Sequence, residues 1–372
     1  MPLEKVYSVA RKKIIIEKTR TMSAFQFKNL LRPNIRTLTP YSSARNEYSG
    51  SPAIYLDANE NAIGAAAGSL FQRYPDPLQQ ELKKQIARMK NVAPQQIFLG
   101  NGSDEAIDLL IRAVCTPATD NILIFPPTYG MYEVAARIND IAVKKLLLNA
   151  DFQLDRDTVK ASMDQHTRIV FFCSPNNPTG NLIHEETITA VLEDFSGLVV
   201  VDEAYIDFSS ARSWTQQLSR YPNLVILQTF SKAWGMAGLR LGMAIAAPEI
   251  INVLNQIKAP YNISAATQQL ATAALKNSNE VEKWIALLGA ERTRLAERLT
   301  IFPFVKTVFP SEANFLLIRV EDAKGLYHYL LEQGIVVRDR SNQPLCKGCL
   351  RVTVGTPEEN EYLIRTLTSY KP

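Results

Sequence analysis

The sequence predicts an α/β protein in which a large, mostly parallel sheet covered by helices is joined to a smaller α+β domain. Apolar, β-branched runs alternate with helical patterns from about residue 76 to residue 258, as is typical of a parallel sheet covered on both faces. After residue 258 the pattern changes to a long helical region followed by short strands and helices. A chain of 372 residues is long enough for one large domain and a smaller one.

Helices and strands are predicted along the first unit from its sequence pattern. Helical spacing occupies 78–89 and 103–114. Short apolar runs bounded by polar or turn residues predict strands at 96–100, 121–125, 142–148, 168–174, 197–204, 223–230 and 240–246.

The second unit begins with helical spacing over 267–299. Further elements are expected at 315–320, 323–334, 335–340 and 349–355, with a last helix from about Pro357. We expect the segment before Gly64 to complete this unit. The predicted domains are a basic extension (1–21), an N-terminal arm with part of the small domain (22–64), a large cofactor-binding domain (65–260) and the small domain (261–372).

The charge distribution argues against a nucleic-acid partner. The net charge is +4, and residues 1–21 carry six basic and two acidic side chains, so the rest of the chain is neutral overall. A targeting presequence is an alternative for this extension, but it has no apolar core or cleavage pattern. We expect it to be non-essential.

Membrane, disulfide and metal chemistry are not expected. No apolar run reaches the roughly 20 residues of a membrane span, and four cysteines are too few for a disulfide framework. Cys346 and Cys349 form a CxxC, which without a second pair or nearby histidines is half of a zinc site. The sequence predicts a reduced, soluble, cytoplasmic protein without a metal.

Asp202 ends the apolar run LVVV, where a buried carboxylate needs a cationic partner. A magnesium ion would suit a nucleotide hydrolase, but the GxxxxGK[ST] loop of that class does not occur in the sequence. A salt bridge to an arginine is the other alternative.

Three further stretches place polar groups at the same predicted sheet edge. In GNGSDEAI, Gly102, Ser103 and Asp104 open a helix that could bind a phosphate, with Ser103 as the N-cap, although such residues often only cap a helix. SPNNPTG offers the amide of Asn177, and PPTYGMY offers the ring of Tyr129. Turn chemistry and core packing are the simpler explanations of these two.

The stretch TFSKAWGMAGLRLG adds a lysine at a strand end. Together these groups fit pyridoxal 5'-phosphate (PLP), which has an aldehyde, a phenolic oxygen, a ring nitrogen and a phosphate. Lys232 would bind the aldehyde covalently and act as the base, and Asp202 would keep the ring nitrogen protonated. The remaining assignments are Asn177 and Tyr205 at the phenolic oxygen, and Ser103, Thr229, Ser231 and Arg240 around the phosphate.

The motifs SPNNPTG, VVVDEAY and TFSKAWGMAGLRLG resemble those of fold type I PLP-dependent aminotransferases, and the resemblance runs from about Arg32 to the C-terminus. More narrowly, RPNIRTLTPYSSARNEYSG, LDANENAIG, RYPDP, PPTYGMY, RDR and GCLRVTVGT resemble the histidinol-phosphate aminotransferase family of histidine biosynthesis. The resemblance implies histidinol phosphate as amino donor and 2-oxoglutarate as acceptor. It also implies a homodimer in which Tyr74 reaches the partner's cofactor phosphate and Tyr41 approaches substrate.

Arg338 and Arg351 lie on two neighbouring strand-like runs, where a guanidinium needs an anion. By resemblance, Arg338 binds the far anion of the substrate and Arg351 the anionic end of either substrate, with Asn177 also at the substrate. A surface pairing of Arg338 with Asp339 or Asp207 is the structural alternative.

Three other functions remain open on the sequence. An aromatic aminotransferase and a PLP-dependent decarboxylase of a phosphorylated amino acid would use the same lysine, aspartate and arginine. A non-catalytic PLP-binding regulator would need a DNA-binding module, and residues 1–21 are too short for one.

Overall fold

The computed structural model describes residues 25–41, 54–67 and 71–371. Its larger sheet has seven strands in the order β1-β7-β6-β5-β4-β2-β3. Their bounds are β1 Ile97–Asn101, β2 Asn121–Ile124, β3 Ala142–Lys145, β4 Thr167–Cys173, β5 Leu198–Asp202, β6 Leu224–Thr229 and β7 Leu241–Ala246. The predicted extension 1–21 lies outside the described residues.

The large sheet is parallel except at one strand. The β2–β3, β2–β4, β4–β5 and β5–β6 pairs are parallel, whereas β7 is antiparallel to both β6 and β1. The carboxyl ends of β4, β5 and β6 therefore meet at one edge. The expectation of a large, mostly parallel sheet is confirmed.

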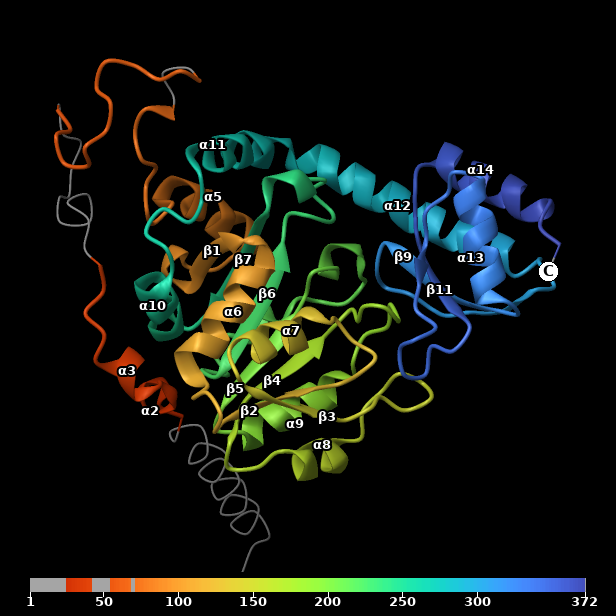
Figure 1. Cartoon of the computed structure of the whole chain (residues 1–372), viewed down its shortest axis with the longest axis horizontal. Helices are drawn as coiled ribbons and strands as arrows, with labels where there is room; N and C mark the ends of the chain where they lie inside the picture. Colours follow the sequence, from red (N-terminus) through yellow and green to blue (C-terminus); the bar gives the residue numbers. More distant parts are fainter. Residues whose placement is uncertain (1–24, 42–53, 68–70, 372) are drawn as a thin grey trace, which may run out of the picture.

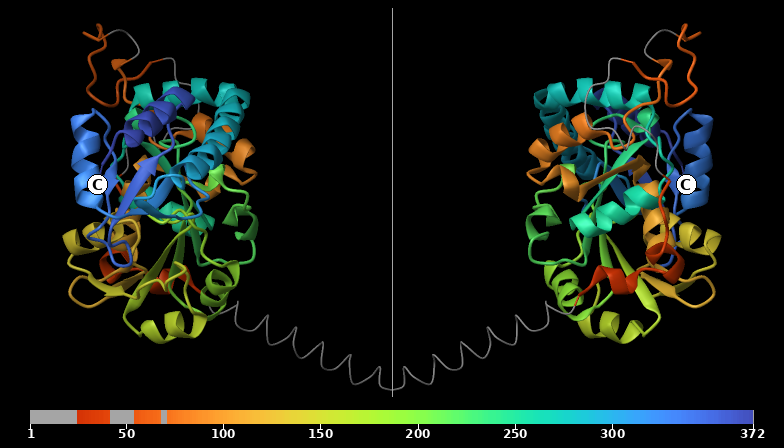
Figure 2. Two further views of the ribbon diagram at one scale, coloured as in Figure 1. Left: turned by 90° about the vertical axis from the view of Figure 1, so that its right-hand side faces the viewer. Right: turned by 90° about the vertical axis from the view of Figure 1, so that its left-hand side faces the viewer.

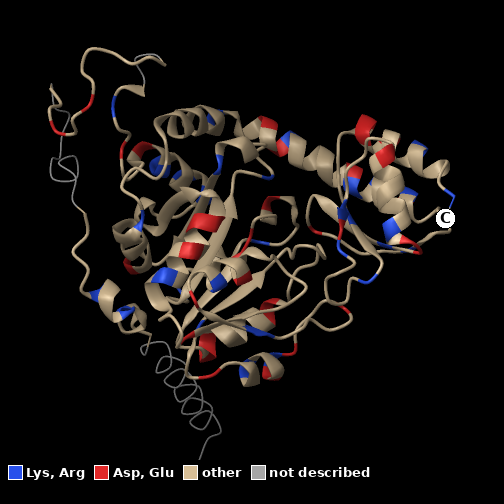
Figure 3. Ribbon diagram, in the orientation of Figure 1, with Lys and Arg blue, Asp and Glu red and all other residues tan. Residues whose placement is uncertain are grey.

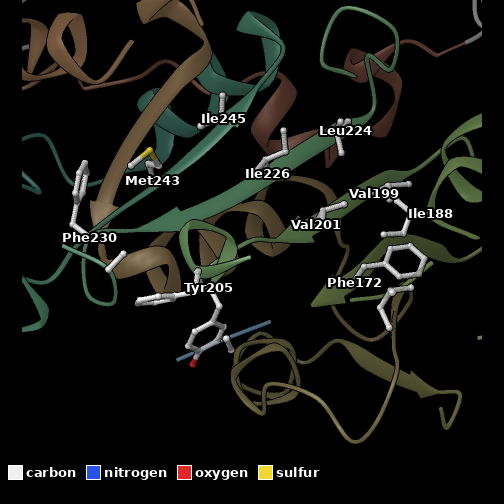
Figure 4. Close-up of a cluster of buried hydrophobic side chains, with 14 of the residues drawn as sticks. Phe172, Ile188, Val199, Val201, Tyr205, Leu224, Ile226, Phe230, Met243 and Ile245 are labelled. Atoms are coloured by element: carbon white, nitrogen blue, oxygen red, sulfur yellow. The ribbon is translucent and has the colours of Figure 1, made fainter. Parts of the chain in front are cut away.

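Helices cover both faces of this sheet (Figure 1). Val199 and Val201 of β5 point into one apolar cluster with Ile226 and Ile245, and Figure 4 shows these side chains together. The alternate residue Val200 points into the cluster on the opposite face. The strands are thus buried on both faces, which explains why they read as continuous apolar runs.

The helices divide between the two faces according to these clusters. On the first face lie α5 (Gln80–Lys90), α8 (Arg156–Ser162) and α9 (Glu185–Asp194). On the second lie α6 (Gly102–Val114), α7 (Met131–Ile138) and α10 (Pro248–Ile257).

The smaller unit is built on an antiparallel sheet in the order β10-β11-β9-β8. Its strands are β8 Val305–Val308, β9 Phe315–Val320, β10 Arg338–Asp339 and β11 Cys349–Thr353, and its helices are α13 Ala323–Glu332 and α14 Pro357–Thr368. These elements share a separate apolar core. The long helix α12 (Ser278–Leu299) follows α11 (Ala265–Ala274) and runs from the large sheet to this unit (Figure 1).

The N-terminal segment divides differently from the expectation. Phe27, Leu30 and Leu31, in and just after α2 (Phe27–Leu30), are buried in the cluster that contains α6 of the large unit. The short helix α3 (Pro33–Arg36) follows. Segment 22–64 was expected to form an N-terminal arm and part of the small domain; within it, α2 buries its apolar side chains in the large-unit cluster that also contains α6. The described part of 54–67 extends from the main body (Figure 2).

Acidic and basic residues are interspersed over both units (Figure 3). Among the described residues, no helix combines the length and apolarity needed to cross a bilayer. Within the same residues no group of three or more His, Cys, Asp or Glu side chains could hold a metal ion. Cys346 and Cys349 are buried free thiols.

Candidate active site

A cavity of about 620 Å³ opens where the carboxyl ends of β4, β5 and β6 meet the N-termini of α6 and α7, with the β10–β11 hairpin of the small unit as its far wall. Most predicted site residues line it. They are Gly102, Ser103, Asp104, Tyr129, Asn177, Asp202, Tyr205, Thr229, Ser231, Lys232, Arg240, Arg338 and Arg351.

Asp202 ends β5 and is fully buried at the floor of this cavity. Its Oδ2 accepts a hydrogen bond from the hydroxyl of Tyr132 at 2.7 Å, and its Oδ1 accepts one from the Ala204 amide at 3.0 Å. Desolvation raises the pKa of Asp202 to about 6 despite these bonds. No described basic side chain forms a salt bridge with it, which removes the arginine-pair alternative. A buried carboxylate in this state fits a cationic ring nitrogen.

One end of the cavity has the character of an anion site. The first turn of α6 opens into it, and Gly102 has φ +70° and donates its amide to the Arg240 carbonyl at 2.6 Å. A Cβ at Gly102 would meet the Arg240 guanidinium, and a Cβ at Gly242 would collide with the Ser103 amide nitrogen. Both glycines allow the backbone to approach closely at this point. The helix terminus thus supplies free N–H groups beside a guanidinium, as a phosphate requires.

Polar side chains complete this cradle. The Thr229 hydroxyl bonds the Ser231 hydroxyl at 3.0 Å, and Arg240 donates to Ser231 at 3.5 Å and lies 3.6 Å from Asp104. The prediction that Ser103 is the N-cap is wrong: α6 begins at Gly102 and its N-cap is Asn101. Ser103 lies within the first turn of the helix.

Lys232 follows β6 and lines the cavity, with its Nζ 5.5 Å from the centroid of the Tyr205 ring. Loss of hydration and the nearby Arg351 lower the pKa of its amine. Burial raises the pKa of Tyr205, so this phenol stays protonated and can donate a hydrogen bond. The amide of Asn177 lies 3.5 Å from the same hydroxyl. The amine of Lys232 and the amide of Asn177 thus both lie close to the phenol of Tyr205.

Arginines form the far wall. Arg351 donates to Asn177 Oδ1 at 2.5 Å and lies over the Phe315 ring at 5.2 Å. Arg338 faces it across the hairpin. Among the described residues no ion pair joins Arg338 to Asp207 or Asp339, the surface pairing considered for it; Asp207 pairs with Lys90 at 3.2 Å and Asp339 accepts from the Ser341 amide.

Tyr129 lines the pocket, and two residues that were not predicted lie at it or directly behind it. The Tyr129 hydroxyl donates to Asp104 at 2.9 Å. Tyr132 was missed, although it is fully buried, bonds Asp202 and stacks on Phe171 at 4.7 Å. Its position three residues after Tyr129 in PPTYGMY was the available signal. Arg340 was also missed, although RDR places it two residues after Arg338.

Tyr41 and Tyr74 do not line the cavity of their own chain. Tyr41 is 71% exposed, and the Tyr74 ring stacks on Tyr261 at 4.5 Å. Their predicted roles therefore depend on a second subunit.

This fold and pocket define an α/β enzyme built to hold a flat, phosphorylated, aldehyde-bearing cofactor. The chain belongs to the class I and II aminotransferase family, whose sequence model matches residues 43–367. It is 52% identical to a histidinol-phosphate aminotransferase of Cytophaga hutchinsonii over 93% of this chain and 100% of that protein. It is 53% identical to one of Bacteroides fragilis over 92% of this chain and 98% of that protein.

This chain is also similar in fold and sequence to a solved structure. The crystal structure of the histidinol-phosphate aminotransferase from Clostridium acetobutylicum is 30% identical, has a TM-score of 0.74 and covers 79% of this chain and 89% of that chain. The fold is the fold type I of PLP-dependent transferases.

Proposed function

We propose that the protein is a PLP-dependent transaminase that moves the amino group of L-histidinol phosphate to 2-oxoglutarate, giving imidazole acetol phosphate and L-glutamate in histidine biosynthesis. The observation that carries this proposal is a single cavity that joins Lys232 and the buried Asp202 to a wall of arginines. Relatives that bear this enzyme's name are about half identical over more than nine tenths of the chain.

The described residues fit PLP group by group. Asp202 would hold the ring nitrogen, Asn177 and Tyr205 the phenolic oxygen, and Lys232 the aldehyde. Gly102, Ser103, Asp104, Thr229, Ser231 and Arg240 would surround the phosphate, with Tyr129 over the ring. When bound, PLP supplies an electron sink that makes the proton on the amine-bearing carbon removable.

The side chains of this chain carry the proton transfers. The amine of Lys232 would take the proton from the amine-bearing carbon of the donor and hold it during amino transfer. Its lowered pKa favours the unprotonated amine that a base requires. Asp202 stays ionised once it faces a cationic ring nitrogen, because a salt bridge then replaces the missing hydration. Tyr205 donates to the phenolic oxygen and so holds the ring in register with Lys232.

The arginine wall selects anionic substrates. Histidinol phosphate carries a phosphate and 2-oxoglutarate carries two carboxylates, so each requires guanidinium groups at the far side of the lysine. We assign Arg338 to the far anion and Arg351 to the anionic end of either substrate. Within the described part of the chain neither arginine has a carboxylate partner that would compete.

We also propose a homodimer with active sites at the subunit boundary. Tyr74 would reach the cofactor phosphate of the partner and Tyr41 would approach its substrate, since neither tyrosine lines the cavity of its own chain. Sedimentation should give twice the 41.6 kDa mass of one chain. A monomer that is fully active at all concentrations would contradict this assembly. The cytoplasmic location stays a prediction.

The test is a half-reaction. Purified protein loaded with PLP is mixed with L-histidinol phosphate, and the visible absorption of the lysine-bound cofactor should convert to that of pyridoxamine phosphate. Adding 2-oxoglutarate should reverse the change and yield glutamate. A decarboxylase would leave the cofactor unconverted and would release carbon dioxide from a phosphorylated amino acid, and that pattern would refute amino transfer.

A further inference from the structure

Three arginines share one face of the β10–β11 hairpin. Arg338 lies directly opposite Arg351 in the antiparallel register, and side chains at opposed positions point to the same face. The Arg340 amide donates to the Cys349 carbonyl at 2.9 Å, which continues the ladder by one residue. Because alternate residues of a strand share a face, Arg340 follows Arg338 onto the pocket side. All three arginines line the cavity.

The guanidinium of Arg340 has no partner among the described residues. Its Nε is buried without a hydrogen bond, and it forms no salt bridge within the described part of the chain. Desolvation and the charges of Arg351 and Arg338 lower the pKa of Arg340. A half-buried cation beside two like charges is costly unless an anion joins it.

The loop that follows holds Arg340 in place. Gln343 donates its amide to the Arg340 carbonyl at 2.9 Å, Cys346 donates to Gln343 at 3.1 Å, and Cys349 donates to Cys346 at 2.9 Å. These successive turns return the chain to β11, with both cysteines buried beneath the hairpin. The guanidinium is therefore presented from a fixed backbone, which reduces the entropy lost when it binds a ligand.

The chemistry of the two donors differs at this wall. Arg351 reaches Asn177, so it lies at the end of the cavity where the reacting carbon of the donor must sit. A carboxylate there offers two oxygens and one charge, which one guanidinium satisfies through paired bonds. A phosphate monoester offers three terminal oxygens and about −1.5 to −2 charges. In histidinol phosphate it also extends farther from the reacting carbon, because a CH₂ and an ester oxygen intervene.

We propose that Arg340 is a specificity-determining residue. It binds the phosphate oxygen that Arg351 does not bind, and so favours a phosphorylated donor over a carboxylate donor. This assignment rests on the proposed function. Amino transfer from glutamate alone would not require this third guanidinium.

The test compares two donors on one cofactor form. Arg340→Gln removes the charge and keeps a polar side chain, and Arg340→Lys keeps the charge without the paired geometry. Arg319→Gln is the matched control, since Arg319 lies on β9 of the same sheet and also has a buried, unbonded Nε but does not line the cavity. For each protein, PLP content is measured, and pyridoxamine formation is followed with L-histidinol phosphate and with L-glutamate.

Arg340→Gln should lower the apparent second-order rate with histidinol phosphate by about 10- to 100-fold, the effect of one charge-assisted hydrogen bond. The rate with glutamate should fall by less than about threefold. Arg340→Lys should recover part of the loss, and Arg319→Gln should show no preference between donors. Equal losses with both donors, or no loss, would overturn the assignment while leaving the proposed function intact. A wild-type enzyme that does not react with histidinol phosphate would overturn both.

Discussion

Asp202 is a single residue whose burial links cofactor binding to pH. Its pKa rises from 3.8 to about 6 because the cavity floor removes its hydration. A raised carboxyl pKa means that the folded, cofactor-free protein binds the proton more tightly than the unfolded chain does. The stability from this proton is present below about pH 4 and is lost as the pH rises through 6.

Asp202→Asn should therefore reverse that loss. In the cofactor-free state, wild type should lose about 3 kcal/mol of its free energy of unfolding relative to this variant as the pH rises from 4 to 7. Urea unfolding at several pH values measures the difference. The same variant should have lost transamination, because an amide cannot hold the ring nitrogen protonated. A stability difference that does not change with pH would show that Asp202 is not desolvated.

Lys232 gives the second prediction at this scale. Lys232→Ala should leave PLP bound only non-covalently and should abolish turnover, because the covalent link and the base are lost together. In wild type, borohydride reduction followed by peptide mapping should label Lys232. A label on another lysine would disprove the assignment.

Local sequence was sufficient to predict that Asp202, Asn177 and Lys232 lie at one edge of the sheet, because each is at or shortly after the end of a recognisable strand. Tyr132 was not predictable in the same way. Its bond to Asp202 joins residues 70 positions apart and depends on how α7 packs against β5. A buried tyrosine on a helix looks the same in the sequence whether or not it meets a carboxylate.

At the scale of elements, the phosphate cradle depends on how closely β7 approaches the start of α6. Gly242 lies against the backbone of Gly102 and Ser103, where a Cβ would collide with main-chain atoms. Gly242→Ala should lower the free energy of unfolding by about 1–3 kcal/mol and weaken PLP binding, because the helix terminus must shift.

Gly238→Ala is the control for this prediction. Gly238 lies just before β7, in the short 3-10 helix Ala237–Leu239, but a Cβ there meets no atom within 4 Å. Its stability should change by no more than about 0.5 kcal/mol, with PLP binding unchanged. Thermal unfolding and PLP titration of both variants decide the matter. Equal stability and equal PLP binding of the two variants would mean that the cradle tolerates a methyl group at Gly242.

Element types and approximate bounds could be predicted, but strand direction could not. β7 is an apolar run like its neighbours, and only its pairing shows that it is antiparallel. The start of α6 was misplaced by one residue because the positive φ of Gly102 is a conformational choice that a glycine permits without requiring. The packing of α2 on α6 likewise depends on contacts distant in sequence.

At the scale of the whole molecule, the N-terminal extension is expected to be separable. The family match begins at residue 43, and residues 1–21 carry the entire net charge. Deleting residues 1–21 should leave the melting temperature, PLP content and transaminase rate essentially unchanged. A large fall in any of these quantities would show that the extension packs onto the active core.

The whole molecule also brings the two units together at one site. The large sheet supplies the lysine, the aspartate and the phosphate cradle, and the small sheet supplies the arginines. Under the proposed function, the cavity therefore contains separate sites for two anions, one belonging to the cofactor and one to the substrate. An aromatic amino acid carries one carboxylate and a neutral side chain, so it would leave part of the arginine wall without an anion.

The most direct test of this account is a comparison of three amino donors on the wild-type enzyme. Values of kcat/KM are measured for L-histidinol phosphate, unphosphorylated L-histidinol and L-phenylalanine, with 2-oxoglutarate as acceptor. Loss of the phosphate removes charge-assisted bonds of about 1.5–3 kcal/mol each, so histidinol phosphate should be preferred by at least about tenfold over either competitor. Equal values for all three donors would contradict phosphate recognition by the arginine wall, and a preference for phenylalanine would identify an aromatic aminotransferase instead.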